Sequence, residues 1–148
     1  MSVFRYKMQN ILNLKYKLEE QAKMDFAAAR KKLDTEEEKL EELYHRREDY
    51  VEEGRKLRES SLPIQDILDN KTAILRMEDY IELQKINVSD AEKELENERV
   101  KMQEAIQERK IYEKLREKAF DNFIKEENAK ESKEIDELTS YTYGQKKR

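Results

Sequence analysis

The feature that most constrains the fold is an apolar repeat whose steps alternate between three and four residues. Side chains in such a heptad repeat form one narrow stripe along an α-helix, which is buried when a partner helix supercoils around it. The repeat positions are Phe26, Ala29, Leu33, Glu36, Leu40, Leu43, Arg47, Tyr50, Gly54 and Leu57 in one stretch, and Ile74, Met77, Ile81, Gln84, Val88, Ala91, Leu95, Glu98, Met102 and Ala105 in another. Towards the N-terminus the stripe continues through Met8, Ile11 or Leu12, Leu18 and Ala22. The sequence therefore predicts two long helices packed as a coiled coil.

Composition supports an all-α fold and excludes several others. The 148 residues are 45% charged and 36% hydrophobic, with two Gly, one Pro and no Cys. So few turn-forming residues argue against a β-sandwich or barrel. The absence of Cys excludes disulfides, thiolate zinc sites and cysteine nucleophiles. No apolar run is long enough for a membrane span or a signal peptide, so we expect a cytoplasmic protein.

The only proline, Pro63, divides the helical pattern, because the residue before a proline is pushed out of the α region. We expect a single coiled-coil domain over 1–148, with a first helix at about 3–58, a connector at about 59–70, a second helix at about 71–140 and a frayed tail at 141–148. Asp66, Asp69 or Asn70 would cap the second helix. Gly54 would loosen the end of the first helix, at a cost of about 1 kcal/mol relative to Ala.

Two helices of similar length joined by a short connector favour an antiparallel hairpin. A fold at Ser61–Pro63 would place Leu57 near Ile74, Leu33 near Glu98, Phe26 near Ala105 and Met8 near Phe123. The last 20 or so residues would then extend past the N-terminus. The alternative is a parallel dimer of two chains, which would have twice the mass and length of the hairpin.

The sequence predicts no catalytic, cofactor-binding or metal-binding residue, and so no enzyme. Acidic runs such as Glu36–Glu38 suit a solvated helix surface, whereas catalytic carboxylates need contrasting environments. The single histidine, His45, has no second imidazole or thiol with which to share a metal ion. There is no glycine-rich loop that would cradle a phosphate.

Charge is unevenly distributed along the chain. Residues 1–18 contain four basic residues and no acidic one, whereas residues 34–59 contain 11 acidic and 6 basic residues. The basic segment is either an ordinary solvated surface or a docking surface for an acidic partner. Its aromatic residues Phe4, Tyr6 and Tyr16 would also suit stacking on single-stranded nucleic acid. The net charge of −4 argues against nucleic acid.

Both ends of the chain resemble the flagellar export protein FliJ family. Phe4–Lys15 is similar to the family's opening pattern, in which spaced aromatic residues precede a Leu-Gln pair and a Leu-x-Leu-Lys step. Lys133–Leu138 is similar to a second family element, a basic residue followed by a hydrophobic-Asp-Glu step. The Tyr80-Ile81 pair early in the second helix also agrees, so the resemblance spans nearly the whole chain.

The resemblance implies a fold and a role. The family forms an antiparallel coiled coil like the stalk of the rotary-ATPase γ subunit, and we expect this chain to be a monomeric rod when free. It is a non-enzymatic part of the flagellar type III export apparatus, at the cytoplasmic face of the inner membrane, and it needs no cofactor. It enters the hexameric export ATPase, promotes its assembly and activity, and contacts the export-gate membrane protein and export chaperones. A generic structural coiled-coil dimer is the alternative.

The resemblance also implies two sets of docking residues. The ATPase-docking residues are Phe4, Arg5, Lys7, Met8, Ile11, Lys15, Ile135, Asp136 and Leu138. The export-gate-binding residues are Tyr80, Ile81, Gln84, Asn87 and Ala91. Lys17 completes the basic N-terminal cluster.

Overall fold

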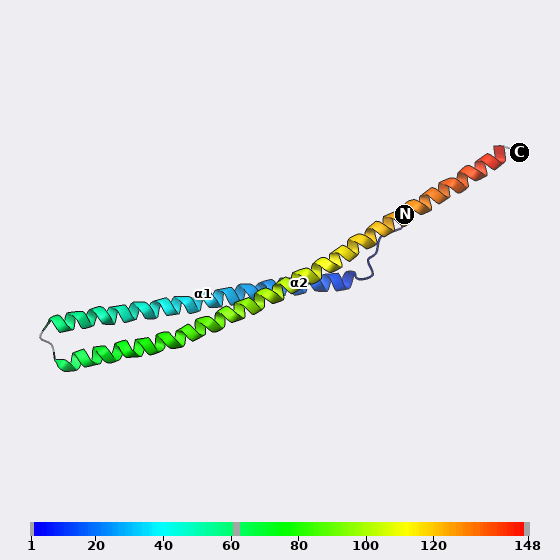
Figure 1. The fold of residues 1–148 in the computed structure, drawn as a ribbon. Helices are drawn as coiled ribbons and strands as arrows, with labels where there is room; N and C mark the ends of the chain where they lie inside the picture. The colour runs from blue at the N-terminus through cyan, green and yellow to red at the C-terminus, as the bar shows by residue number, and fades with distance from the viewer. Residues whose placement is uncertain (1, 61–62, 147–148) are drawn as a thin grey trace. The chain divides into compact units, whose positions relative to one another are not determined.

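The computed structural model describes residues 2–60 and 63–146, and these residues form two long helices without a strand. Helix α1 spans Gln9–Glu59 and helix α2 spans Ile64–Lys146, running in opposite directions and packed against each other (Figure 1). The helices contribute to two compact units: a terminal unit of Met1–Glu20 with Gln103–Arg148, and a turn unit of Gln21–Met102. The predicted all-α, two-helix antiparallel fold is confirmed.

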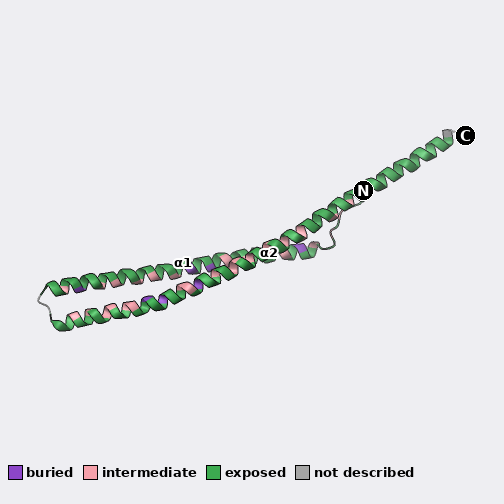
Figure 2. Cartoon of the chain, in the orientation of Figure 1, coloured by how far each residue is buried: buried purple, intermediate pink, exposed green. Residues whose placement is uncertain are grey.

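The seam of the turn unit follows the heptad repeat. Every repeat position from Phe26 to Leu57 is buried or half-buried, and every residue between those positions is exposed (Figure 2). The most deeply buried apolar side chains are those of Ala29, Leu33, Ile81 and Ala91. The predicted seam is therefore confirmed in this unit.

Polar residues in the seam pair across it. The Gln84 amide donates to the backbone oxygen of Glu36 at 2.8 Å and to its carboxylate at 2.6 Å. The Arg47 guanidinium donates to Glu78 Oε1 at 3.0 Å. Because each of these polar side chains has a hydrogen-bond partner, the seam contains them without the free-energy cost of a buried, unsatisfied polar group.

The predicted pairing register is wrong by about one heptad. Leu33 does not lie opposite Glu98, because its neighbour Lys32 pairs with Glu94 at 2.9 Å. Leu57 does not lie opposite Ile74, because Tyr50, one heptad before Leu57, already accepts a hydrogen bond from Asn70 at 2.8 Å.

The cause of the error is an early start of α2. The helix begins at Ile64, directly after Pro63, rather than near residue 71. Proline suits the start of a helix, where its missing N–H would have no partner in any case. The Asp66 N–H donates to the Pro63 oxygen at 3.1 Å, which closes the first turn. The predicted fold point at Ser61 and Leu62 lies outside the described residues.

Gly54 and Asn70 form a close contact between the two helices. Helix α1 continues through Gly54 to Glu59 without a break. Asn70 does not cap α2, and its Nδ2 donates to the Tyr50 oxygen at 2.8 Å. A methyl group at position 54 would overlap Oδ1 of Asn70 and lie 3.2 Å from its Cγ. Glycine therefore leaves room for the Asn70 amide.

Replacing Gly54 by Ala tests this contact in a double-mutant cycle. In the parent chain, Gly54→Ala should be nearly neutral, because a gain of about 1 kcal/mol in helix propensity is offset by the displaced Asn70 hydrogen bond. In an Asn70→Ala background the same change should stabilise by about 1 kcal/mol. Urea denaturation of the four chains should therefore give a coupling free energy of about 1 kcal/mol. A coupling near zero would show that the Asn70 amide does not constrain position 54.

The N-terminal segment is not helical before Gln9, although the sequence predicts a helix from about Val3. The Phe4 ring lies 5.2 Å from that of Phe120 and 5.5 Å from that of Phe123. These aromatic contacts with α2 hold the segment away from the path of α1. The predicted proximity of Met8 and Phe123 is seen, since both line one open hollow at this end.

The C-terminal part of α2 is helical and uncovered. The helix runs to Lys146, so the predicted end near residue 140 and the frayed tail from 141 are not seen within the described residues. Residues 128–145 are exposed throughout (Figure 2). Within the described part of the chain, neither helix has a stretch long and apolar enough to cross a membrane.

Candidate docking surfaces

The basic residues near the N-terminus fall into two structural classes. Arg5, Lys7 and Lys17 are exposed. Lys15 is half-buried, with its Nζ 3.4 Å from Glu108 Oε2 and 5.5 Å from the centre of the Tyr112 ring. Lys15 therefore holds α1 against α2, and the other three bases are the ones that can face a partner.

Exposed aliphatic side chains follow in the first turns of α1. Ile11, Leu14 and Leu18 are 39%, 52% and 47% exposed, and their spacing places them on one side of α1. Leu12, at 1% exposure, is the residue that enters the seam. We call the exposed set Arg5, Lys7, Ile11, Leu14, Lys17 and Leu18 the basic face.

Leu18 is exposed because its neighbour takes the predicted seam position. Glu19 is only 5% exposed and receives two hydrogen bonds from Arg109, at 2.6 Å from Nε and 3.2 Å from Nη2. Arg109 also donates to Glu113 at 2.8 Å, and the Tyr16 hydroxyl donates to the same carboxylate. The terminal unit thus contains a linked charge cluster where the sequence predicts a leucine.

The charge cluster shifts the acidity of its members. The Tyr16 hydroxyl and then Arg109 hold the pKa of Glu113 below its ordinary value. Hydrogen bonds to Glu19 and Glu113 raise the pKa of Arg109, and the bond to Glu113 raises the pKa of Tyr16. Because the pKa of Glu113 is lower in the folded chain than in the unfolded chain, its ionisation stabilises the fold at a pH above the unfolded-state pKa. This stabilisation is lost as the pH falls through the folded-state pKa.

Phe4 and Met8, both predicted to dock a partner, differ in accessibility. Phe4 is half-buried, and the Arg116 guanidinium lies 5.5 Å from the centre of its ring, in addition to the contacts with Phe120 and Phe123. Met8 is 41% exposed. Phe4 therefore positions the N-terminal segment, while Met8 remains open to a partner.

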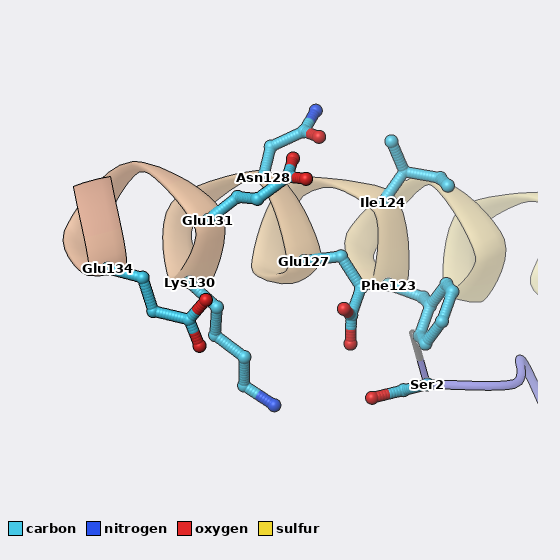
Figure 3. Close-up of a pocket in the computed structure, with 8 residues that line it drawn as sticks. All are labelled: Ser2, Phe123, Ile124, Glu127, Asn128, Lys130, Glu131 and Glu134. Atoms are coloured by element: carbon cyan, nitrogen blue, oxygen red, sulfur yellow. The ribbon is translucent and has the colours of Figure 1, made fainter.

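The first residues of the N-terminal segment lie beside an acidic stretch of α2. Ser2 lies next to Phe123 and Glu127 in an open groove (Figure 3). The groove continues along α2 past Glu131 to Glu134. The predicted docking residues Ile135, Asp136 and Leu138 follow directly on this helix and are all exposed.

The predicted gate-binding residues do not share one surface. Tyr80 and Asn87 are exposed, whereas Ile81, Gln84 and Ala91 are at most 8% exposed and face α1. The Asn87 side chain donates to Gln84 Oε1 at 3.1 Å. Only Tyr80 and Asn87 can therefore contact a partner in this structure.

A second apolar surface lies on α2, outside the predicted seam. Four aliphatic residues outside the heptad repeat are between 51% and 60% exposed: Leu68, Leu75, Leu83 and Ile86. We call them the outer α2 face. These residues do not belong to the heptad stripe, so the stripe alone does not predict them. Their sequence signal is that they are apolar residues outside the repeat.

The described residues hold no candidate metal site. No group of three or more His, Asp or Glu side chains gathers around a common point between residues 2–60 and 63–146. His45 lies on the surface, 3.9 Å from Glu41 one turn earlier.

Comparisons with known proteins identify the family. The profile of the family described as Flagellar FliJ protein matches residues 4–148. No curated protein matches the sequence. Among solved structures, a putative YscO homolog, CT670 from Chlamydia trachomatis, is similar with a TM-score of 0.78 and 24% identity, covering 98% of each chain. That likeness concerns the fold, and it agrees with the two-helix architecture. The family match over nearly the whole sequence shows that this chain belongs to the FliJ family of flagellar export components.

Proposed function

We propose that the chain is a non-enzymatic stalk of the flagellar export ATPase complex, at the cytoplasmic face of the inner membrane. Its terminal unit enters the hexameric ATPase ring, promotes ring assembly and activity, and so supports flagellum formation and motility. The observation that carries the proposal is the basic face, where the exposed bases Arg5, Lys7 and Lys17 occur in the same short segment as exposed aliphatic side chains. Charged residues around an apolar centre are the usual make-up of a protein docking surface.

The uncovered end of α2 supports the same role. Ile135 and Leu138 are 59% and 65% exposed, on a helix whose side chains remain available to a surrounding ring. A helix pair inside a six-fold ring contacts the subunits unequally and can bias their conformations. It favours the assembled ring by binding it better than the separate subunits. No step in this mechanism requires a catalytic residue on the stalk.

Contact with the export gate and with export chaperones completes the proposal. Tyr80 is 51% exposed and Asn87 is exposed as well, both outside the seam, so these two residues would bind the gate. Ile81, Gln84 and Ala91 would act indirectly, by fixing α2 against α1. Tyrosine suits such a contact because it combines an apolar ring with a polar end.

The decisive experiment measures the ATP hydrolysis rate and the hexamer fraction of the purified export ATPase with and without this chain. We expect both quantities to rise together, because a ligand that prefers the ring shifts subunits towards it. An ATPase shown to be active, but unchanged in rate and assembly by the chain, would refute the stalk role.

A further inference from the structure

The outer α2 face is an apolar surface that the described residues leave open. Leu68, Leu75 and Ile86 follow one another at spacings of seven and eleven residues, two and three helical turns, so they lie on one side of α2. Leu83 adjoins Ile86 one turn earlier. Because the seam is formed by Ile81 and its heptad partners, this side points away from α1.

The surface is unusual for this chain. All four side chains are more than half exposed in a sequence that is 45% charged. On α1 between residues 34 and 59, the exposed large apolar residues that the structure describes are Tyr44 and Val51, at 43% and 41%. Clustered exposed aliphatic groups mark contact surfaces, whereas single ones need no explanation.

The charge around this surface restricts what can cover it. Residues 64–92 contain seven acidic and three basic side chains. Asp79 and Asp90 are exposed and lie between or beside the aliphatic residues on the same side of the helix. A matching partner therefore needs an aliphatic stripe flanked by positive charge.

The basic face of this same chain has that chemistry. Ile11, Leu14 and Leu18 form an exposed aliphatic stripe, Lys17 adjoins it on α1, Lys7 precedes it in the same segment, and no acidic residue precedes Glu19. We propose that the basic face of one chain docks on the outer α2 face of a second copy. The two surfaces differ, so each chain carries both halves of the contact.

The association has a regulatory consequence that rests on the proposed function. The basic face is also the surface proposed to enter the ATPase ring, so a chain docked on its neighbour cannot engage the ring at the same time. Concentrated free chain would then be held in a store, and dilute chain would be monomeric and competent to bind. The association itself does not depend on the ATPase.

Sedimentation velocity of the full chain, from 1 to 500 µM, tests the association without any ATPase. At 50 mM NaCl we expect the mean mass to rise continuously with concentration, and at 500 mM NaCl to rise much less, because salt screens the opposed charges.

Leu83→Gln with Ile86→Gln should lower the association constant at least tenfold. The control Met24→Gln with Val51→Gln removes exposed apolar groups from α1 and should leave association unchanged. Circular dichroism checks that helicity is kept.

A charge exchange makes the test specific to the two faces. Lys7→Glu with Lys17→Glu should weaken association, and so should Asp79→Lys with Asp90→Lys. A chain that carries all four changes again has complementary faces and should associate like the parent. Three results would overturn the proposal. The chain stays monomeric at 500 µM and low salt, or association survives Leu83→Gln with Ile86→Gln, or the fourfold exchange fails to restore association. None of these results involves the ATPase, so the association and the proposed ATPase role are tested independently.

Discussion

Replacing Arg109 by Ala should lower the melting temperature of the chain by about 8 °C, the largest effect we expect from any single substitution. The change leaves the Glu19 carboxylate enclosed at 5% exposure without the guanidinium that donates two hydrogen bonds to it. Removing one partner of a buried ion pair costs more than the net worth of the pair. Thermal unfolding followed by circular dichroism at neutral pH measures the loss.

Two matched chains show whether burial is the cause. Changing Glu19 and Arg109 together to Leu should keep the melting temperature within about 2 °C of the parent, because apolar side chains of similar size replace the whole ion pair. Arg99→Ala removes a guanidinium that pairs with exposed Glu96 at 2.5 Å, and it should have almost no effect. Equal losses from Arg109→Ala and Arg99→Ala would mean that the charge cluster behaves as a surface ion pair.

The combined change of Arg5, Lys7 and Lys17 to Glu should weaken ATPase binding about fiftyfold at low salt, because it reverses three charges on the proposed docking surface. All three side chains are exposed, so helicity should be unchanged. Lys15 is left as it is, since its contacts with Glu108 and Tyr112 belong to the packing of α1 on α2. Binding is measured by titrating labelled chain with ATPase at several salt concentrations.

The control for this experiment reverses three exposed bases of the turn unit. Lys31, Lys56 and Lys93 changed together to Glu alter the net charge equally, but lie outside the basic face. We expect this chain to bind within about threefold of the parent. If both triple changes weaken binding alike, the ATPase senses overall charge, and the basic face has no special role.

The seam could be predicted from sequence because heptad spacing is local, while the register and the N-terminus could not. Register depends on where α2 starts, and Pro63 entering the first turn moved that start by about one heptad. The helix start at Gln9 depends on Phe4 packing against Phe120, a contact between residues far apart in sequence. Glu19 was missed because a carboxylate enters a seam only when a distant partner, here Arg109, is present.

The predicted docking residues differ in accessibility for a related reason. Arg5 and Lys7 are exposed, but they precede α1 and lie outside its helical stripe. Ile81, Gln84 and Ala91 were assigned both to the heptad seam and, by resemblance, to the gate surface. The structure puts them in the seam. A residue's position within its repeat was in this case the better guide to its accessibility.

The uncovered end of α2 has a thermodynamic consequence for any partner that binds it. Residues 128–145 are helical but exposed throughout, so their helix depends on intrinsic propensity and on side-chain pairs one turn apart. A helical segment of this length is only marginally stable without tertiary packing. A partner that encloses it must therefore hold a marginally stable helix in one conformation, and the lost conformational entropy offsets part of the contact free energy. Such coupled ordering favours many contacts with modest net affinity, which allows a stalk to be released as well as gripped.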